Sequence, residues 1–553
     1  MTPMPISIRP FTGSYFAAKL EAFWCLILTA VLFFNVFDRA EAADVQAANC
    51  SLASVQTACA VTSPGDRVIV PAGTATWSGV LTITKDIQLV GAGIGQTIIT
   101  NNIVGSLISW TTSSNGFCRL SGFDFEAGPP DISGGGSGNT LMNINGTCHA
   151  FRMDNCQFNG INEYVYFITG WVYGVIDHCT FNTKFSICDV QMQNFDNVPY
   201  GDGSWAAPDD WGTTNALYME SCDFTGPTNL LYGIMDGFAG SRVVIRYCNV
   251  TNLAVGSHGL DSTGRSRSMR HYEVYENNFV TITNSTAAIS QAVQVRGGTA
   301  LVWSNVIYGN YVAGVQLSDY RLAGIAGQYP PWGTVNGLCA WDSNNPTLFD
   351  SGTINGTSNN YYGYPLVVDT NKNWAVNQWL SNTAPFVIYD IALGLGITVS
   401  YLGNDRTTIN LNVFMPLTNG DSYEIRQVFA TLDEAGYGQG DLIMDTYPSS
   451  GIPSNTVTHS QSWPHEVLDP VYVWGNNFTT ILQGYGSTLV GYLSPQTVVA
   501  GTPKPGYAPL VYPHPLVSSS GTGTGTGIGT GTGTGTNSVI PPSELQAHPP
   551  GTQ

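Results

Sequence analysis

The sequence predicts an all-β protein built as a solenoid of short, stacked strands. Two observations support this prediction: a six-residue pattern recurs along the chain, and the spacing between its copies is typical of a structural repeat. The pattern MDNCQF at residues 153–158 returns as IDHCTF at 176–181 and as MESCDF at 219–224. The other copies are LSGFDF, IRYCNV, VYENNF, VWSNVI and VWGNNF, centred on Phe123, Cys248, Asn277, Asn305 and Asn476.

Each copy has apolar residues at the same positions. Counted from Cys156, Cys179 or Cys222, an apolar residue lies three places earlier and another two places later, with a further one usually five places earlier. Side chains of a strand alternate between its two faces, so this pattern indicates two strands separated by a two-residue corner.

The copies recur after 23 residues (156 to 179), 26 (222 to 248), 29 (248 to 277) and 28 (277 to 305). Periods of this length are typical of repeat architectures. Burying the roughly five apolar side chains of one copy stabilises it by about 1.5 to 3 kcal/mol each, whereas ordering its backbone costs about 1 to 2 kcal/mol per residue. A single copy therefore cannot fold alone. Copies stacked at about 4.8 Å pair their backbones, so we expect the cysteines to form a column that Asn277 and Asn305 continue.

The composition fits this fold and excludes some partners. The chain has 553 residues, of which 43% are hydrophobic and only 10% are charged. A net charge of −19 with 19 basic residues argues against broad contact with nucleic acid or an anionic membrane, because either would need an extensive positive surface.

The N-terminus has the features of a secretory signal peptide. Arg9 and Lys19 precede the apolar segment Ala22–Phe37, which is followed by Ala40, Glu41 and Ala42 in an A-x-A arrangement. We expect cleavage after Ala42 and a secreted, extracellular protein. The alternative is an uncleaved anchor, for which sixteen residues are short against the roughly 20 of a bilayer span.

Ten cysteines remain after this cleavage, and export permits disulfides. The best candidates are Cys50 and Cys59, which a local loop could bring together. The cysteines of the repeated pattern are expected to be buried small hydrophobic residues.

The segment after residue 50 predicts how the solenoid begins. Ser51 is placed to cap a short helix over LASVQTACA, before the turn SPGD and the strand RVIVPAG. With its PGDRVIVPAGTATW and GAGIGQTIIT, this opening resembles secreted right-handed parallel β-helix proteins of the pectin-lyase-like fold. The resemblance spans about residues 50–310 and 466–485. It implies a right-handed parallel β-helix but no single reaction, because that superfamily includes lyases, glycoside hydrolases, epimerases, adhesins and phage tailspikes.

The predicted organisation has five parts. A signal peptide (1–42) precedes the N-terminal cap and β-helix (43–335), an inserted β-module (336–440), a return to the β-helix with a C-terminal extension (441–515) and a flexible Gly/Thr-rich tail (516–553). The module is predicted from short β-segments such as PLVVDT and GITVSYL, and the return from PVYVWGNNF. The alternative is that one domain ends and another begins.

Seven of the fourteen arginines lie between residues 242 and 321 of this acidic chain. Guanidinium groups bind carboxylates in bidentate fashion, so this cluster indicates an acidic polysaccharide as ligand. The candidate catalytic residues are Asp236, His258, Asp261, Arg265, Arg267 and Arg270, and the candidate substrate-binding residues are Trp205, Arg242 and Arg296. The alternative is a solvated salt-bridge face in which the arginines pair with Asp236, Asp261, Glu273 and Glu276.

Two reactions are compatible with these residues. For β-elimination an arginine neutralises the uronate carboxylate, and His258 or a deprotonated arginine is the base. For hydrolysis the natural pair of carboxylates is Asp236 with Asp261.

A second loop, residues 197–212, carries Trp205, Asp209, Asp210 and Trp211. The Trp faces could stack on sugar rings or instead anchor the loop, and the two acids could hold calcium, although no cofactor is otherwise expected.

We therefore expect a secreted, monomeric polysaccharide lyase or glycoside hydrolase that binds no nucleic acid and, after signal cleavage, no membrane. The alternative is a non-catalytic adhesion or scaffold protein.

Overall fold

The computed structural model describes residues 42–518 apart from sixteen internal gaps. These gaps are residues 114–115, 129–139, 162–163, 184–189, 194–201, 228–232, 258–267, 282–288, 318–347, 381–385, 394, 412–414, 428–434, 441–465, 481–488 and 491–496. The apolar segment Ala22–Phe37 and the Gly/Thr-rich run therefore lie outside the described residues.

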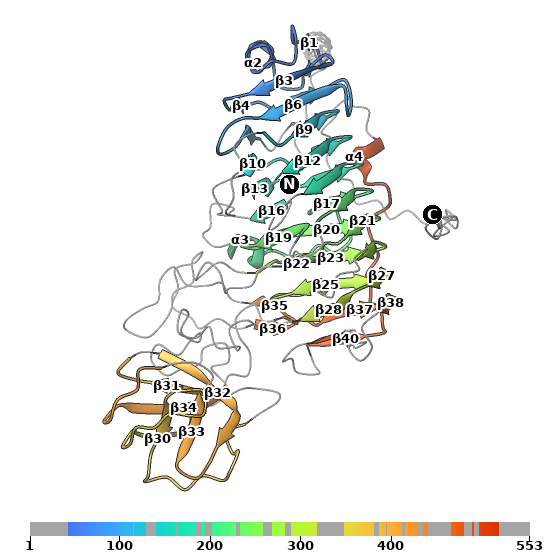
Figure 1. The fold of residues 1–553 in the computed structure, drawn as a ribbon. Coiled ribbons are helices and arrows are strands. Elements are labelled where there is room, and N and C mark those ends of the chain that lie inside the picture. Colours follow the sequence, from blue (N-terminus) through green and yellow to red (C-terminus); the bar gives the residue numbers. More distant parts are fainter. Residues whose placement is uncertain are drawn as a thin grey trace, which may run out of the picture.

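The main body is a right-handed parallel β-helix whose coils stack from the N-terminal end downward in Figure 1. Each full coil contributes one strand to each of three parallel sheets, named here A, B and C in the order in which the chain visits them. Sheet A contains β1 (Asp44–Gln46), β2 (Arg67–Ile69), β5 (Gln88–Val90), β8 (Cys118–Ser121), β11 (Phe151–Asp154), β14 (Gly174–Asp177), β17 (Leu217–Glu220), β20 (Arg242–Arg246), β23 (His271–Tyr275), β26 (Leu301–Trp303), β37 (Val471–Trp474) and β40 (Val498–Ala500).

Sheets B and C complete the coils. Sheet B contains β3 (Gly73–Trp77), β6 (Thr97–Asn101), β9 (Asp124–Glu126), β12 (Gln157–Ile161), β15 (Thr180–Thr183), β18 (Asp223–Thr225), β21 (Asn249–Thr251), β24 (Asn278–Val280), β27 (Val306–Gly309) and β38 (Asn477–Thr480). Sheet C contains β4 (Leu81–Ile83), β7 (Ile108–Thr112), β10 (Thr140–Gly146), β13 (Tyr164–Gly170), β16 (Val190–Gln193), β19 (Met235–Phe238), β22 (Val255–Ser257), β25 (Ile289–Val295), β28 (Tyr311–Leu317) and β39 (Leu489–Val490). The predicted fold class is confirmed.

The repeated pattern forms the corner between sheets A and B, and equivalent residues stack as predicted. Phe125, Phe158, Phe181 and Phe224 form a column of nearly parallel rings, with successive centroids 5.3, 5.0 and 4.7 Å apart. Where asparagine replaces cysteine at the corner, the column becomes a hydrogen-bonded ladder. The Nδ2 of Asn277 donates to Oδ1 of Asn305 (3.0 Å), and the Nδ2 of Asn305 donates to Oδ1 of Asn476 (2.9 Å).

A left-handed residue makes each of these corners. The residue just before the pattern's central position has a positive φ in every copy, for example 52° at His178, 54° at Tyr247 and 56° at Glu276. Glycine takes this position at 122 and 475. Non-glycine residues adopt this conformation at a cost of roughly 1 to 2 kcal/mol, so the stacked cores on either side must hold the corner in place.

Helix α2 (Leu52–Val61) covers the open N-terminal end of the solenoid. Its N-cap is Ser51, whose hydroxyl accepts a hydrogen bond from the Ser54 N–H, and it buries Val55, Ala58 and Cys59. The predicted Cys50–Cys59 disulfide is wrong in this structure, where both thiols are free. The helix itself separates them, because about eight residues at a rise of 1.5 Å place the two ends roughly 12 Å apart, beyond disulfide reach.

The inserted module is a separate β-structure below the solenoid in Figure 1. Its strands are mostly antiparallel, in the order β29 (Leu348–Thr353), β34 (Ser422–Gln427), β31 (Phe386–Asp390), β32 (Leu395–Asn404), β33 (Thr408–Leu411) and β30 (Leu366–Val368). It has its own core, which includes Val367, Ile388, Ile409 and Ile425. After it, β35 (Tyr437–Gly440) pairs with β36 (Glu466–Leu468), and β37 then pairs in parallel with β26. The chain thus returns to the β-helix, as predicted.

Helices are few in the described part of the chain. The others are α3 (Asp202–Ala206) and α4 (Pro515–Ser518). Among the described helices, none is long and apolar enough to cross a lipid bilayer.

Candidate functional site

The outer faces of the three sheets differ in what lies over them. Sheet B carries an exposed ladder of amides and carboxylates, in which Asn249 Nδ2 donates to Asp223 Oδ1 (2.8 Å) and Asn278 Nδ2 donates to Asn249 Oδ1 (3.1 Å). The ladder's own hydrogen bonds satisfy these groups. Sheet B is therefore the weakest of the three candidates for a ligand-binding surface.

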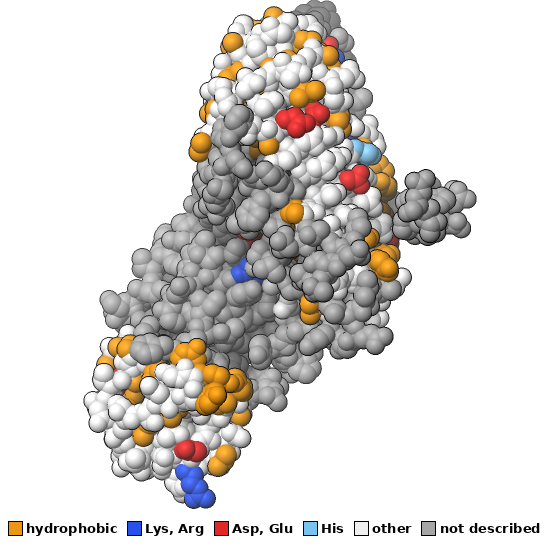
Figure 2. All heavy atoms as spheres, viewed as in Figure 1, with side chains coloured by type: hydrophobic (Ala, Val, Ile, Leu, Met, Phe, Trp, Pro, Cys, Tyr) orange, Lys and Arg blue, Asp and Glu red, His pale blue; other side chains and the backbone are white. Residues whose placement is uncertain are grey.

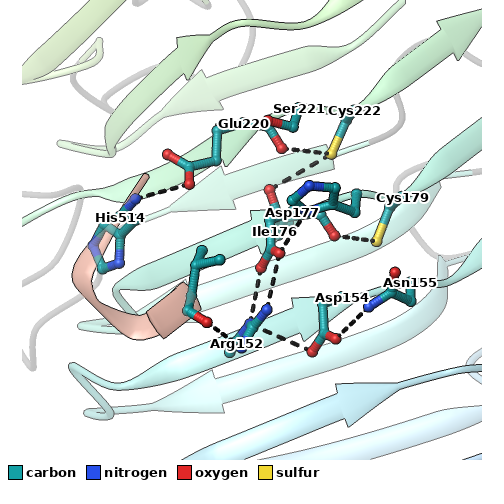
Figure 3. A network of polar contacts seen from close by, with 12 residues as sticks. Arg152, Asp154, Asn155, Ile176, Asp177, Cys179, Glu220, Ser221, Cys222 and His514 are labelled. Carbon is teal, nitrogen blue, oxygen red and sulfur yellow. Dashed lines mark hydrogen bonds and ion pairs between the residues drawn. The ribbon is translucent and has the colours of Figure 1, made fainter. Parts of the chain in front are cut away.

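The outer face of sheet A carries a row of polar and aromatic residues that we call the charged row. The row lies two places before each pattern centre, and parallel pairing aligns its members from coil to coil: Ser121, Asp154, Asp177, Glu220, Arg246, Tyr275, Trp303 and Trp474. Figure 3 shows part of it, with Arg152 reaching from β11 toward Asp154 and Asp177. Arg152 donates to both Asp177 oxygens at 2.9 and 3.0 Å.

Residues 504–518, which we call the C-terminal strap, cover the charged row. Arg246 donates to Glu220 Oε2 (2.8 and 2.6 Å) and to the strap carbonyls of Leu510 (2.6 Å) and Val511 (3.1 Å). Glu220 Oε1 accepts a hydrogen bond from the His514 backbone N–H at 2.8 Å, as Figure 3 shows. Arg246 and Glu220 are both fully buried, so their charges stabilise the protein's own chain and face no ligand.

The electrostatics of the charged row reflect this burial. Burial raises the pKa of Asp154, but the hydrogen bonds and charge of Arg119 outweigh it and hold that pKa below its ordinary value. Burial raises the pKa of Glu220, although Arg246 opposes the shift. Burial, with the nearby charges of Arg246 and Arg152, lowers the pKa of His514 to about 3, so this imidazole is neutral at physiological pH.

Three of the predicted site residues hold the loop that contains α3. Arg242 is 1% exposed and donates to the Ser204 side chain and carbonyl (3.0 and 2.8 Å) and to the Asp209 carbonyl (3.2 Å). Arg270 contacts the Asp209 carboxylate, and Trp205 is fully buried with its Nε1 donating to the Ser268 carbonyl (3.1 Å). The geometry thus gives these residues partners within the fold, and Trp205 anchors its loop.

The two acids of this loop do not fit a calcium site. Asp209 contacts Arg270, and Asp210 Oδ2 lies 3.8 Å from Arg242 and accepts a hydrogen bond from Asn215 (3.0 Å). Guanidinium groups already balance their charge, whereas calcium needs several oxygen ligands free of cations. In the described part of the chain no group of three or more His, Cys, Asp or Glu could hold a metal ion.

The outer face of sheet C differs from both other faces. Parallel pairing aligns an unbroken row of positions that we call the amide row: Ser109, Asn143, Phe167, Gln191, Asp236, Gly256, Gln294 and Gln316. Asn143 lies between the core residues Met142 and Ile144, and Gln294 lies between the core residues Val293 and Val295. Because side chains alternate along a strand, Asn143 and Gln294 point away from the core.

Asp236 and Gln294 flank a gap in this row. Gly256 stands between them in register and has no side chain, and two strand steps separate them by roughly 10 Å. Asp236 is 8% exposed, Gln294 3% and Arg296, which directly follows the end of β25, 7%. A carboxylate, an amide and a guanidinium on neighbouring coils are therefore all largely buried, and electrostatic interactions are strong in such an environment.

Two amide oxygens of the row are unsatisfied. Asn143 Oδ1 and Gln294 Oε1 are buried and make no hydrogen bond with any described residue. A buried polar atom without a partner costs about 1 to 3 kcal/mol, so such atoms indicate a ligand or water that binds there.

The longest connections of the solenoid border sheet C. Residues 194–216, 258–270 and 318–470 lead from its strands to sheet A, and residues 127–139 and 281–288 lead into it from sheet B. In the coils that carry the repeated pattern, by contrast, the corners between sheets A and B have only two residues, as at 155–156. Loops on a rigid scaffold commonly carry binding and catalytic residues, so sheet C is the best candidate site.

The structure thus distributes the predicted site residues over two regions. Asp236 lies on sheet C and Arg296 directly follows the sheet C strand β25, while Arg242, Arg270 and Trp205 lie where the α3 loop packs against the solenoid. His258, Asp261, Arg265 and Arg267 lie outside the described residues, in the connection that follows β22. The catalytic and substrate-binding roles of all nine stay predictions.

Sequence reasoning missed the amide row and the function of the charged row. The sequence analysis assigns no role to Asp154 and Glu220, and both are fully buried strand ends with arginine partners. Aligning the residues two places before each pattern centre would have revealed an Asp, Asp, Glu, Arg sequence in adjacent coils.

Comparisons with known proteins add a likeness of fold. No protein-family model and no curated protein sequence matches the chain. Solved structures that it resembles include a PL6-family polysaccharide lyase from Pseudopedobacter saltans (14% identity, TM-score 0.34, 56% of this chain and 70% of that one) and a Geobacillus virus E2 protein (12%, 0.28, 77% and 86%). A pectin methylesterase from Erwinia chrysanthemi is another (10%, 0.24, 49% and 79%).

Proposed function

We propose that the protein binds an acidic polysaccharide along the outer face of sheet C and cleaves it there. The observation that supports this proposal is the amide row, which includes Asp236 and runs beside Arg296, with two amide oxygens that no described residue satisfies. Amides of Asn143, Gln294 and Gln316 are suited to sugar hydroxyls, since each group both donates and accepts hydrogen bonds. Repetition of the row from coil to coil suits a polymer whose own units repeat.

The chemistry that best matches this set is β-elimination from a uronate. Arg296 would bind the sugar carboxylate and stabilise the negative charge that develops on it. Asp236 would accept the proton α to that carboxylate and a carbon–carbon double bond would form, while the glycosidic oxygen at the β position takes a proton from solvent water and leaves as a hydroxyl group. His258, Arg265, Arg267 and Arg270 remain proposed participants, because the connection that carries them starts at the end of β22, one strand from Asp236.

Hydrolysis would require a second carboxylate about 5 Å from Asp236 for retention or about 6.5 to 9.5 Å for inversion. Asp261 is the proposed partner in that case. A secreted, monomeric protein fits either reaction.

The test is a depolymerisation assay on a panel of uronate and neutral polysaccharides, with and without calcium. New reducing ends together with ultraviolet absorbance from unsaturated uronates identify a lyase, and reducing ends alone identify a hydrolase. We expect Asp236→Asn to lower kcat at least about 100-fold, because general acid–base groups typically contribute that much. The matched control is Asp223→Asn on the sheet B ladder, which should retain full activity.

No cleavage of any polymer by the unmodified protein would reject the catalytic proposal. The remaining function would be the non-catalytic adhesion or scaffold role. If Asp236→Asn cleaves as fast as the unmodified protein, the reaction takes place elsewhere on the molecule.

A further inference from the structure

A cluster of exposed tyrosines lies on the inserted module, away from sheet C. Tyr361 is 93% exposed, Tyr401 71%, Tyr362 56% and Tyr364 36%. We call these four residues the tyrosine cluster. Figure 2 shows hydrophobic side chains, a class that includes tyrosine in that view, gathered on the module, whereas they are scattered on the described solenoid surface.

The tyrosine rings are held in fixed positions although they are exposed. The hydroxyls of Tyr362 and Tyr401 share a hydrogen bond of 2.9 Å, which joins the turn before β30 to strand β32. The rings of Tyr361 and Tyr362 meet edge to face with centroids 5.3 Å apart. A ligand that binds these rings would therefore meet preformed faces and would lose little affinity to ordering them.

The backbone of the turn is equally well fixed. Asn360 Oδ1 accepts hydrogen bonds from the N–H groups of Tyr362 (2.9 Å) and Tyr364 (3.0 Å). The Asn360 N–H donates to the Tyr364 carbonyl (2.8 Å), and the Leu366 N–H donates to the Ser358 carbonyl (2.8 Å). Gly363 has φ of 80°, the left-handed conformation that this tight turn requires.

The composition of the turn indicates the kind of ligand. Residues 357–364 read TSNNYYGY and contain only hydroxyl, amide, glycine and tyrosine groups, with no charge and no aliphatic side chain. A protein partner would require an apolar core that excludes water, and an acidic ligand would require a cation. Flat aromatic faces edged by uncharged polar groups instead match an uncharged sugar ring, which has apolar C–H faces and hydroxyl edges.

We propose that the tyrosine cluster is a binding site for a neutral polysaccharide, separate from the acidic-polymer site proposed on sheet C. Sugar rings stack on Tyr361 and Tyr401, and Tyr362 fixes the position of Tyr401 through their shared hydrogen bond. The module has a core of its own, so the site does not depend on the chemistry of sheet C. Binding at the tyrosine cluster would hold the protein on a neutral polysaccharide while the solenoid acts on an acidic polysaccharide.

The test is affinity electrophoresis of the full chain in gels that contain soluble derivatives of cellulose, xylan, starch or chitin. We expect at least one of these polymers to retard the unmodified protein. Tyr361→Ala and Tyr401→Ala should each weaken binding about tenfold, a loss in the range of one stacked aromatic contact. Tyr308→Ala is the matched control, since Tyr308 is a solenoid tyrosine of 47% exposure, and it should bind normally.

Three results would overturn the proposal. The first is no retardation of the unmodified protein by any neutral polymer, and the second is unchanged retardation of Tyr361→Ala and Tyr401→Ala. The third is a concentration-dependent dimer that Tyr361→Ala dissolves, which would make the cluster a contact between two copies. Asp236→Asn separates the two proposals, because it should abolish cleavage of acidic polymers and leave retardation by the neutral polymer unchanged.

Discussion

The outer faces of sheets A and C are both polar and both hold buried side chains, yet they differ in whether the described chain satisfies those groups. On sheet A, Arg246 and Glu220 are fully buried, and the strap satisfies their remaining hydrogen-bonding groups. On sheet C, Asn143 and Gln294 keep amide oxygens that no described residue satisfies. The denser cluster of charge thus belongs to the face that the chain itself covers, and the less charged face is the better candidate for a ligand.

The largest expected effect comes from removing a charge from sheet A. Arg246→Ala should lower the free energy of unfolding by about 3 to 5 kcal/mol, because it leaves Glu220 buried without its ionic partner and frees the carbonyls of Leu510 and Val511. Thermal unfolding followed by circular dichroism measures the change. The matched control is Arg67→Ala, whose pair with Asp44 is about half exposed and should contribute no more than about 1 kcal/mol.

If Arg246→Ala and Arg67→Ala are equally stable, the charged row does not hold the strap. The buried charges of sheet A would then contribute no more to the free energy of unfolding than an exposed ion pair does.

A smaller effect should follow from acidifying the protein. The pKa of His514 lies at about 3 in the folded protein and near 6.5 when unfolded, so the unfolded chain binds the proton first as pH falls. The stability that neutral His514 provides is complete above pH 6.5 and declines between pH 6.5 and 3, by an amount on the order of a few kcal/mol. Melting temperatures across this pH window measure the effect.

His514→Phe should flatten that pH dependence. The control is His178→Asn at an exposed corner, which should leave it unchanged, since asparagine tolerates the left-handed conformation that His178 adopts. Identical pH profiles for the unmodified protein and His514→Phe would show that the strap is insensitive to this imidazole.

The smallest effect on stability should come from sheet C. Gln294→Ala removes a buried amide whose oxygen is unsatisfied, so we expect a change in unfolding free energy within about 1 kcal/mol. Affinity for the polysaccharide that the protein cleaves should fall about tenfold, measured by calorimetry, because a hydrogen bond to ligand is worth roughly 1.4 kcal/mol. Asn249→Ala on sheet B should not alter affinity. A Gln294→Ala variant that binds normally but unfolds easily would assign this amide a structural role instead.

The sequence is most informative where structure repeats. The alternation around Cys156, Cys179 and Cys222 predicts both the fold and the register, because each coil can bury its core only by stacking like residues on like. The return of the chain at Asn476 after a long insertion was predictable for the same reason.

The candidate site was predictable only in part. The clustering of Arg242, Arg246 and Arg270 is real, because the first two lie on β20 and the third directly precedes β23, the next strand of sheet A. Their partners, however, come from other parts of the chain. Arg152, for example, donates to Leu516, 364 residues later. No local pattern shows that a distant segment will cover a charge, and the amide row escapes notice because single Asn and Gln residues are common in turns.

The strap also changes how the protein must fold. Its contacts run in order from Asp469 near β37, which binds Lys504, through Glu220 on β17 to Arg152 on β11. Neighbouring coils of a solenoid otherwise interact only with each other and can come apart one by one from an end. A segment that spans them couples distant coils, so the coils between β11 and β37 cannot come apart independently. Because the strap follows every sheet A strand in the chain, the buried charges of sheet A lack their cover until this segment has been synthesised.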